Sequence, residues 1–330
     1  MKKIKIIASI NNYDLIHFTT KELARLSNNK IDYFRLNLSK KNELNELFKK
    51  LLELENVFKD KLIIDIPYPR EKSRLFFSPN EFEFIKNSCY IFNISSLKKS
   101  NYYIANFNGN IHLKKYDELV FGDGEGKFVF NKRIRDDMFE VIAKDNFKGF
   151  SGKAIHFGVS SSMHCNKENI VEYKKVINSI KPNMIAFSFV ENSQELDNLR
   201  FLFNLENTKI ISKIESNNGI DNIKDIVDKS DIILYGRGDA RIYCSAFKLG
   251  INQKKIIDVA RKNGKEIFVA TGVLSSMKDG KLPQPSDIID VTQMIVDKVN
   301  GVVFGADIKN MQLVLDLLHD IDREIIWQNK

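Results

Sequence analysis

Short apolar runs alternate with amphipathic stretches along most of the chain. The apolar runs are rich in β-branched residues or Phe, which is typical of buried parallel strands. Apolar positions recur at helical spacing between them. The expected strands are Ile4–Ile10, Asp32–Leu38, Lys61–Ile66, Met184–Val190, Lys209–Ile214, Ile232–Tyr235, Glu266–Ala270 and Gly301–Phe304. The expected helices are Thr20–Leu26, Asn42–Leu54, Lys167–Ile177, Ser193–Phe203, Gly219–Val227, Gln253–Lys262, Pro285–Lys298 and Lys309–Leu318.

This alternation predicts the α/β class, with a parallel sheet covered by helices. Eight strand–helix units with short links favour a closed (β/α)8 TIM barrel, because eight such units close the barrel. A doubly wound open sheet is the alternative that the pattern leaves open.

A segment of about a hundred residues interrupts the rhythm after the third strand. It contains alternating runs such as DELVFGDGEGKFVFNKR, with Gly, Asn and Asp at expected turns, which predicts a small β-rich domain. An insertion in a βα loop lies at the active-site end of a barrel. We therefore expect residues 1–70 and 159–330 to form the barrel and residues 71–158 to form a β-rich lid domain.

Composition narrows the class of protein. The 330 residues are 43% hydrophobic and 28% charged, which suits a globular protein and excludes a disordered polyelectrolyte. No apolar run reaches the length of a membrane span, and the apolar start ends too early for a signal peptide. Three cysteines without a C-x-x-C spacing favour a reducing, cytoplasmic location.

The net charge is +8, which raises the question of an acidic partner. Basic residues are interspersed with acidic ones, as in KKNELNELFKK, rather than gathered in a patch. This favours a small acidic substrate over nucleic acid, and no membrane partner is expected.

Polar residues follow three consecutive expected strands in the second half of the chain. Lys213 and Glu215 are two apart and therefore point to the same side of their strand. Gly238 and Asp239 follow the next strand, and Thr271 follows the one after. Two carboxylates at neighbouring strand ends suit Mg2+ or Mn2+, and a lysine beside them suits an anion. The alternative is that Lys213 and Glu215 form an ion pair inside the barrel and that Gly236–Asp239 is an ordinary turn.

A second polar group follows the second and third strands. Arg35, Asn37 and Ser39 alternate and share one face, and Asp65 is near the end of the third strand. An arginine at a barrel mouth suits a phosphate or carboxylate. The alternative is a structural Arg35–Asp65 salt bridge.

These pieces together resemble the pyruvate kinase family along nearly the whole chain. The resemblance rests on KIIASI, FRLNLS, IIDIPYPR, IISKIESNNGIDNIKDIV, DIILYGRGDA and FVATGVLSSM, in the family's order. It implies a TIM barrel with a β-rich lid after the third strand. It also implies action on phosphoenolpyruvate, pyruvate or a close analogue, with ADP or ATP as the second substrate. A homo-oligomer is compatible with the resemblance.

The resemblance also implies residue roles. Lys213, Thr271 and Arg35 would act on the phosphoryl group and the enolate, and Asp123 would close over the site from the lid. Gly238, Ser188, Phe189 and Lys153 would contact substrates. Glu215 and Asp239 would hold a divalent metal, and Asn37, Ser39 and Asp65 a candidate K+.

Several family positions differ here, mostly on the nucleotide side. They are Asn11-Asn12, Lys40-Lys41, Ile66, Pro283–Asp287 and Phe304–Asp307. We also expect no counterpart of the family's C-terminal regulatory domain. Arg70 replaces a usual Glu, and its charge is a hypothetical substitute for K+. The leading hypothesis is a metal-dependent phosphotransferase. A metal-dependent, enolate-forming lyase or aldolase and a non-catalytic paralogue are the alternatives.

Overall fold

The computed structural model describes residues 3–10, 31–38, 49–50, 53, 59–94, 101–105, 113–157, 167–305 and 311–328. The expected helix Thr20–Leu26 and most of Asn42–Leu54 lie outside these ranges. So do Ser39, Asn11-Asn12, Lys40-Lys41 and the end of Phe304–Asp307.

By its internal contacts the chain forms two compact units. The first comprises Met1–Pro67, Val171–Ala240 and Phe247–Lys330, and the second Tyr68–Ile170 and Arg241–Ala246. The sequence pattern placed the boundaries after residues 70 and 158 instead. Residue 70 directly follows β3, which ends at Pro69, and residue 158 lies outside the described residues.

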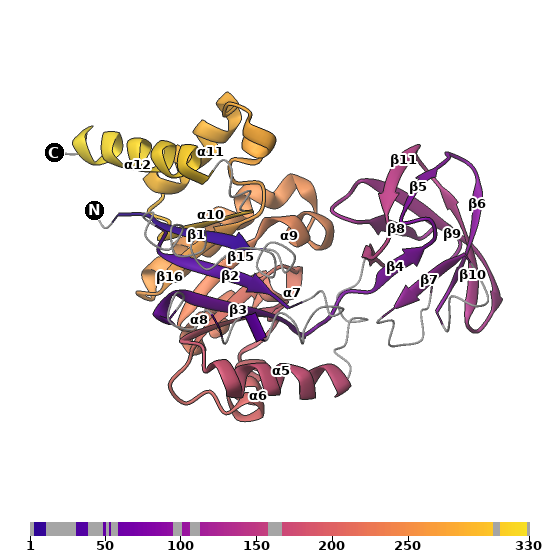
Figure 1. Cartoon of the computed structure of the whole chain (residues 1–330), viewed down its shortest axis with the longest axis horizontal. Helices are drawn as coiled ribbons and strands as arrows, with labels where there is room; N and C mark the ends of the chain where they lie inside the picture. Colours follow the sequence, from indigo (N-terminus) through magenta and orange to yellow (C-terminus); the bar gives the residue numbers. More distant parts are fainter. Residues whose placement is uncertain are drawn as a thin grey trace. The chain divides into compact units, whose positions relative to one another are not determined.

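The first unit contains a closed barrel of eight described strands in the order β1-β17-β16-β15-β14-β13-β3-β2 (Figure 1). The barrel prediction is confirmed, and the open-sheet alternative is wrong. Neighbouring strands of this barrel pair in parallel, as in β14–β15, where Ile211 pairs with Ile232. The strands are β1 (Lys5–Ile10), β2 (Tyr33–Asn37), β3 (Leu62–Pro69), β13 (Met184–Ser188), β14 (Lys209–Ile214), β15 (Ile232–Gly236), β16 (Glu266–Ala270) and β17 (Gly301–Gly305).

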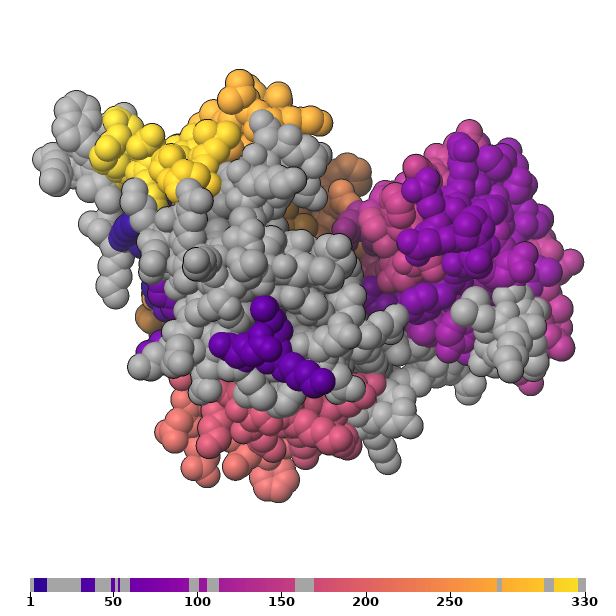
Figure 2. Space-filling model, in the orientation of Figure 1, coloured from indigo at the N-terminus to yellow at the C-terminus, as the bar shows by residue number. Residues whose placement is uncertain are grey.

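Helices cover the outside of these strands. In Figure 1, α11 and α12 lie on one side of the strands and α5 and α6 on the other. Figure 2 shows α11 and α12 next to each other at the surface. The α-helices of this unit are α5 (Lys167–Ile180), α6 (Ser193–Phe203), α7 (Asn217–Asp221), α8 (Ile223–Lys229), α9 (Arg237–Tyr243), α10 (Leu249–Lys262), α11 (Pro285–Val296) and α12 (Met311–Gln328), with parts of α5 and α9 in the second unit. Short 3-10 turns lie at Lys59–Lys61, Ala246–Lys248 and Ser275–Gly280.

Most described helices begin near their predicted residues for local reasons, although α12 continues to Gln328 instead of ending at the predicted Leu318. Helix α6 begins after Asn192, whose side chain accepts a 3.0 Å bond from Glu195 N, and it ends at Asn204, with φ 56°. The predicted helix Gly219–Val227 is instead two helices, α7 and α8, divided at Asn222. The Asn222 side-chain Nδ2 donates to the Glu191 carbonyl at 2.8 Å, outside the helical ladder. None of the described helices is long and apolar enough to cross a lipid bilayer.

Apolar side chains fill the middle of the first barrel. Ile7, Ile63, Ile211, Phe268 and Val303 form one cluster with neighbours from other strands. Gly301 belongs to this packing, because a Cβ there would lie 2.7 Å from the Ile7 Cδ1 atom. A side chain at residue 301 would therefore displace the core.

The second unit contains its own closed barrel of seven described strands, in the order β10-β6-β7-β4-β12-β8-β9, and the pair β11-β5. The turn Gly122–Glu125 joins β8 to β9 as a hairpin, as the sequence indicates. The strands are β4 (Arg74–Phe77), β5 (Glu81–Phe84), β6 (Cys89–Asn93), β7 (Tyr102–Ala105), β8 (Glu118–Phe121), β9 (Gly126–Arg135), β10 (Met138–Ala143), β11 (Phe147–Phe150) and β12 (Lys153–His156). The role of this unit as a lid stays a prediction.

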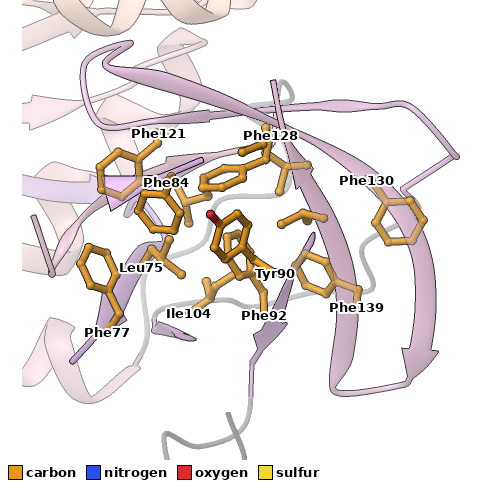
Figure 3. Packing of buried hydrophobic residues seen from close by; sticks show 14 of the residues in the cluster. Leu75, Phe77, Phe84, Tyr90, Phe92, Ile104, Phe121, Phe128, Phe130 and Phe139 are labelled. Carbon is orange, nitrogen blue, oxygen red and sulfur yellow. The ribbon is translucent and has the colours of Figure 1, made fainter. Parts of the chain in front are cut away.

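Aromatic rings fill this second barrel (Figure 3). Phe84 is fully buried, stacks on Phe147 at a centroid distance of 4.9 Å, and packs edge-on against Phe128 at 5.1 Å. Such pairs add to the free energy gained from burial alone. Phe84 therefore makes a large contribution to the stability of this unit.

We predict that Phe84→Ala lowers the free energy of unfolding of the second unit by about 3–5 kcal/mol, because it opens a cavity among packed rings. Hydrogen exchange of β5, β9 and β11 amides measures this unit separately. Phe150→Ala on β11 is the control, since Phe150 is exposed and its loss should cost much less. Equal effects of the two substitutions would contradict this account of the core.

Candidate active site

The barrel interior changes from apolar to polar toward the carboxyl ends of the strands. Ile7, Ile63 and Ile211 belong to the apolar cluster. Two residues further along the same strands are Ser9, Asp65 and Lys213. Alternate residues of a strand share one face, so these polar side chains continue the interior column. The polar end is the end at which barrel enzymes place their chemistry.

A buried carboxylate joins two cations at this end. Asp65 on β3 is 1% exposed, and its Oδ2 accepts a 2.7 Å bond from Arg35 Nε on β2. Lys213 Nζ on β14 lies 3.3 Å from the same oxygen. Arg35 Nη1 also donates to Ser9 Oγ at 2.7 Å. The Arg35–Asp65 salt bridge is therefore present, and it holds the guanidinium in one orientation.

Lys213 and Glu215 point the same way, as their spacing predicts. Lys213 Nζ lies 3.2 Å from Glu215 Oε1 and donates to Ser188 Oγ at 2.9 Å. Glu215 Oε2 accepts a 3.1 Å bond from the Phe189 amide. Phe189 has a φ of 52°, a left-handed conformation that is uncommon for a bulky residue. The strained backbone at Phe189 thus supplies the N–H that orients Glu215.

The charges of this cluster set two pKa values. Burial raises the pKa of Asp65, but the charges of Lys213 and Arg35 outweigh it and hold the pKa below its ordinary value. Burial lowers the pKa of Lys213, but Asp65 and Glu215, with a smaller effect of Asp239, raise it above its ordinary value. Asp65 is therefore an anion and Lys213 a cation at neutral pH.

Gly238, Asp239 and Thr271 follow the next two strands. Strand β15 ends at Gly236, and Gly238 and Asp239 belong to the first turn of α9 rather than to a free turn. A Cβ at Gly238 would lie 2.9 Å from Thr271 Cγ2, so glycine permits this close approach. Thr271 has a φ of 73°, which is rare for a β-branched residue. Strain of this kind clusters at functional sites.

The carboxylates of Glu215 and Asp239 are of the chemical type that binds a hard divalent cation. Both carboxylates raise the pKa of Lys213 through their charge. A Cβ at Gly236 would lie only 2.4 Å from Glu215 Oε1, so glycine keeps this space open. Mg2+ is commonly held by one or two carboxylates, with water and substrate oxygens as further ligands. In the described part of the chain, no cluster of three or more His, Cys, Asp or Glu could hold a metal ion alone.

The other predicted residues divide between the two units. Asn37 on β2 pairs in register with Asp65 on β3, while Ser39 lies outside the described residues. Asp123 and Lys153 belong to the second unit. There, Lys153 forms an ion pair with Glu125, whose Oε2 accepts a 2.7 Å bond from the Asp123 amide. Burial raises the pKa of Glu125, but the bond from Lys153 and further hydrogen bonds and charge bring it below its ordinary value.

Sequence reasoning missed three residues that position this cluster. Ser9 orients Arg35, and its alternation with Ile7 in KIIASI is the signal that could have found it. Arg237 donates to the Thr271 carbonyl and to Asp290, both at 2.8 Å. Glu191 is buried and accepts a 2.6 Å bond from Ser216, the N-cap of α7. No local pattern distinguishes Glu191 from a surface glutamate.

Comparison with known proteins gives consistent matches. The model of the pyruvate kinase barrel domain matches residues 117–312, which is more than half of the chain. A pyruvate kinase of Thermoplasma acidophilum is 36% identical over 127 residues, covering 38% of this chain and 23% of that protein. A pyruvate kinase of Sporosarcina psychrophila is 27% identical over 221 residues, covering 61% of this chain and 37% of that protein. A pyruvate kinase of Pyrobaculum aerophilum is 30% identical over 184 residues, covering 54% of this chain and 40% of that protein. The matches thus span less than half of these relatives.

We predict that Asp65→Asn lowers the free energy of unfolding at pH 7 by about 3–5 kcal/mol, because two buried cations lose their anion. A carboxylate with a lowered pKa stabilises the folded state above its unfolded pKa, near 4, and this stabilisation is lost as pH falls through the folded pKa. The difference between wild type and variant should therefore shrink below about pH 4. Urea unfolding across pH 3–7, followed by circular dichroism, measures it.

Asp197→Asn is the matched control for this prediction. It removes a carboxylate that pairs with Lys229 at 3.0 Å on the surface, where both side chains are exposed. Exposed pairs contribute less than about 1 kcal/mol. A similar loss of stability in both variants would refute the central role of Asp65.

Proposed function

Since the chain belongs to the pyruvate kinase family, we propose that it is a metal-dependent phosphotransferase acting on phosphoenolpyruvate, pyruvate or a close analogue. The second substrate in this proposal is ADP or ATP. The observation that supports it most is the buried Lys213, which keeps its positive charge at the polar end of the barrel between two carboxylates.

Lys213 is suited to stabilise charge rather than to accept a proton. Its raised pKa keeps the ammonium protonated at neutral pH, and its contacts with Ser188, Asp65 and Glu215 fix its position. A preorganised cation stabilises charge that develops on a transferring phosphoryl group, without reorganisation during the reaction. We assign Lys213 to the phosphoryl group in transit.

Arg35 is assigned to a substrate phosphate or carboxylate. Asp65 contacts its Nε and Nη2 atoms, and Ser9 accepts a hydrogen bond from Nη1. A guanidinium held in this way presents its remaining N–H groups in a fixed direction, which suits a planar or tetrahedral anion. Ser188 and Phe189 are assigned to the pocket wall, and Gly238 to the approach of substrate beside Thr271.

Glu215 and Asp239 are assigned to Mg2+ or Mn2+. The bound cation would neutralise charge on the phosphoryl and carboxylate oxygens of the substrate. The Phe189 amide holds Glu215 in one orientation, and the short helix α9 holds Asp239. Asn37, Ser39 and Asp65 are assigned to a monovalent cation such as K+, as the family resemblance implies.

Thr271 is assigned to proton transfer at the enolate carbon. It follows the last residue of β16, its side chain is exposed, and Arg237 holds its carbonyl. An exposed hydroxyl at a strand end can exchange protons with water. In the second unit, Asp123 is assigned to the lid and Lys153 to the nucleotide phosphates, because Glu125 contacts both the Lys153 side chain and the Asp123 backbone.

We predict that Lys213→Met lowers kcat for pyruvate formation about 100- to 1000-fold, since one preorganised charge is lost at the transition state. The measurement is pyruvate formed from phosphoenolpyruvate and ADP, coupled to lactate dehydrogenase. Lys209→Met on the same strand is the control, because Lys209 is exposed and should leave kcat unchanged.

No turnover by the wild-type chain with any nucleoside diphosphate and Mg2+ or Mn2+ would contradict the phosphotransferase proposal. Proton exchange at the pyruvate methyl group without nucleotide would instead favour a lyase. Equal loss of activity in both lysine variants would exclude a specific role of Lys213.

We predict that Glu215→Gln weakens Mn2+ binding at least about tenfold, because an anionic oxygen ligand becomes a neutral amide. Electron paramagnetic resonance of free Mn2+ measures binding without requiring activity. Glu206→Gln is the control, since Glu206 is exposed beyond α6. Unchanged Mn2+ affinity in Glu215→Gln would exclude the assigned metal site.

A further inference from the structure

A cavity of about 430 Å3 opens at the amino end of the first barrel, opposite the candidate active site. Ile4 precedes β1, Glu266 begins β16 and Asn300 precedes β17, and all three line it. Asp322 of α12 and Arg261 of α10 complete its wall with neighbouring residues. The volume lies in the range of small-molecule sites.

Three basic side chains line this cavity without a carboxylate partner in the described part of the chain. Lys265 Nζ donates to the Ser230 carbonyl at 2.7 Å, and Arg261 Nη1 to the Asp297 carbonyl at 3.3 Å. Lys298 follows α11 in a left-handed conformation, with φ 63°. The charge of Arg261 also acts on Asp258, but that carboxylate is bound by Lys254 at 2.7 Å. These cations are available for an anion.

One of the two acidic residues in the wall is already neutralised. Glu266 Oε1 accepts a 2.6 Å bond from Lys5 Nζ, which also lies 5.5 Å from the centre of the Tyr33 ring. This ion pair removes most of the repulsion that Glu266 would exert on an anion in the cavity. The wall is therefore positive on the side of Arg261, Lys265 and Lys298.

Asp322 provides a different feature. It is 3% exposed, and no described residue donates a hydrogen bond to its buried Oδ1 atom. An unpaired buried acceptor is costly and usually has a partner that completes it. Burial raises the pKa of Asp322. A backbone hydrogen bond from Ile4 and the charges of Lys3 and His319 lower it, but by less. The Oδ1 atom therefore lacks a donor, although the carboxyl group accepts a hydrogen bond from the Ile4 backbone.

The wall is held in place by the barrel itself. The Asn300 side chain accepts a 3.0 Å bond from Ile267 N, and the Asn300 amide donates to the Ile267 carbonyl at 2.9 Å. The Val299 amide donates to the Met294 carbonyl at 2.9 Å and fixes the turn that carries Lys298. A wall anchored to strand ends is preorganised, so little order is lost on binding.

We propose that this cavity binds a small organic anion that carries both an anionic group and a hydrogen-bond donor. The phosphate or carboxylate contacts Arg261, Lys265 and Lys298, and a hydroxyl or ammonium group of the same molecule donates to Asp322 Oδ1. An anion without a donor leaves Asp322 Oδ1 without a hydrogen bond and is repelled by the charge of Asp322. The cavity therefore discriminates by the donor as well as by the charge.

Isothermal titration of the full chain with four probes tests this proposal. Glycerol 3-phosphate and glycerate carry the donor and distinguish a phosphate from a carboxylate source. Methyl phosphate and acetate lack the donor and are their matched controls. We expect one of the first two to bind saturably, at least about fivefold more tightly than its control, since a single hydrogen bond contributes about 1 kcal/mol.

Substitutions place the binding in the cavity rather than at the candidate active site. The double substitution Arg261→Gln with Lys298→Gln should weaken binding at least tenfold, whereas Lys262→Gln, an exposed neighbour that does not line the cavity, should change it less than twofold. Both altered residues are exposed, and melting temperatures verify that the variants fold.

Three outcomes would overturn the proposal. No saturable binding of glycerol 3-phosphate or glycerate to the wild-type chain would exclude the site. Binding that persists in the double variant, or that falls equally in Lys262→Gln, would place the probe elsewhere or reduce the effect to net charge. Equal affinity for methyl phosphate and glycerol 3-phosphate would remove the role of Asp322.

Discussion

The polar end of the barrel depends on the Asp65 carboxylate, which stands between the Arg35 guanidinium and the Lys213 ammonium. Two cations buried this closely repel each other and lose their hydration, and neither cost can be met by apolar neighbours. Asp65 offsets both costs and at the same time fixes the direction of each cation. The same interaction therefore stabilises the fold and prepares charges for an anion.

The two ends of the first barrel carry different arrangements of charged side chains on the same strands. At the carboxyl ends, cations and carboxylates contact one another, and glycines at residues 236 and 238 keep space beside them. At the amino ends, Lys5 neutralises Glu266, while Arg261, Lys265 and Lys298 have no acidic partner among the described residues. The apolar cluster of Ile7, Ile211 and Phe268 separates the two ends.

The second unit obtains its stability from aromatic packing around Phe84, independently of the first barrel's core. Helix α9 connects the units covalently, because it begins with Arg237 in the first and ends with Tyr243 in the second. Within the second unit, Tyr243 hydroxyl and His156 Nδ1 lie 2.8 Å apart, and His156 Nε2 lies 2.9 Å from the Gly122 carbonyl oxygen. These bonds hold the end of α9 that belongs to the second unit.

The sequence by itself determined the strands, since runs such as Lys209–Ile214 and Glu266–Ala270 are buried on both faces and carry that pattern without interruption. It also determined that Lys213 and Glu215 share a side, because strand periodicity is local. Only the tertiary structure decided that the barrel closes, that Asp65 lies between Arg35 and Lys213, and that Glu191 and Arg237 hold neighbouring turns. Those contacts join residues from 25 to 148 positions apart. Local preferences carry no information about pairings at such separations, which packing of the whole barrel selects.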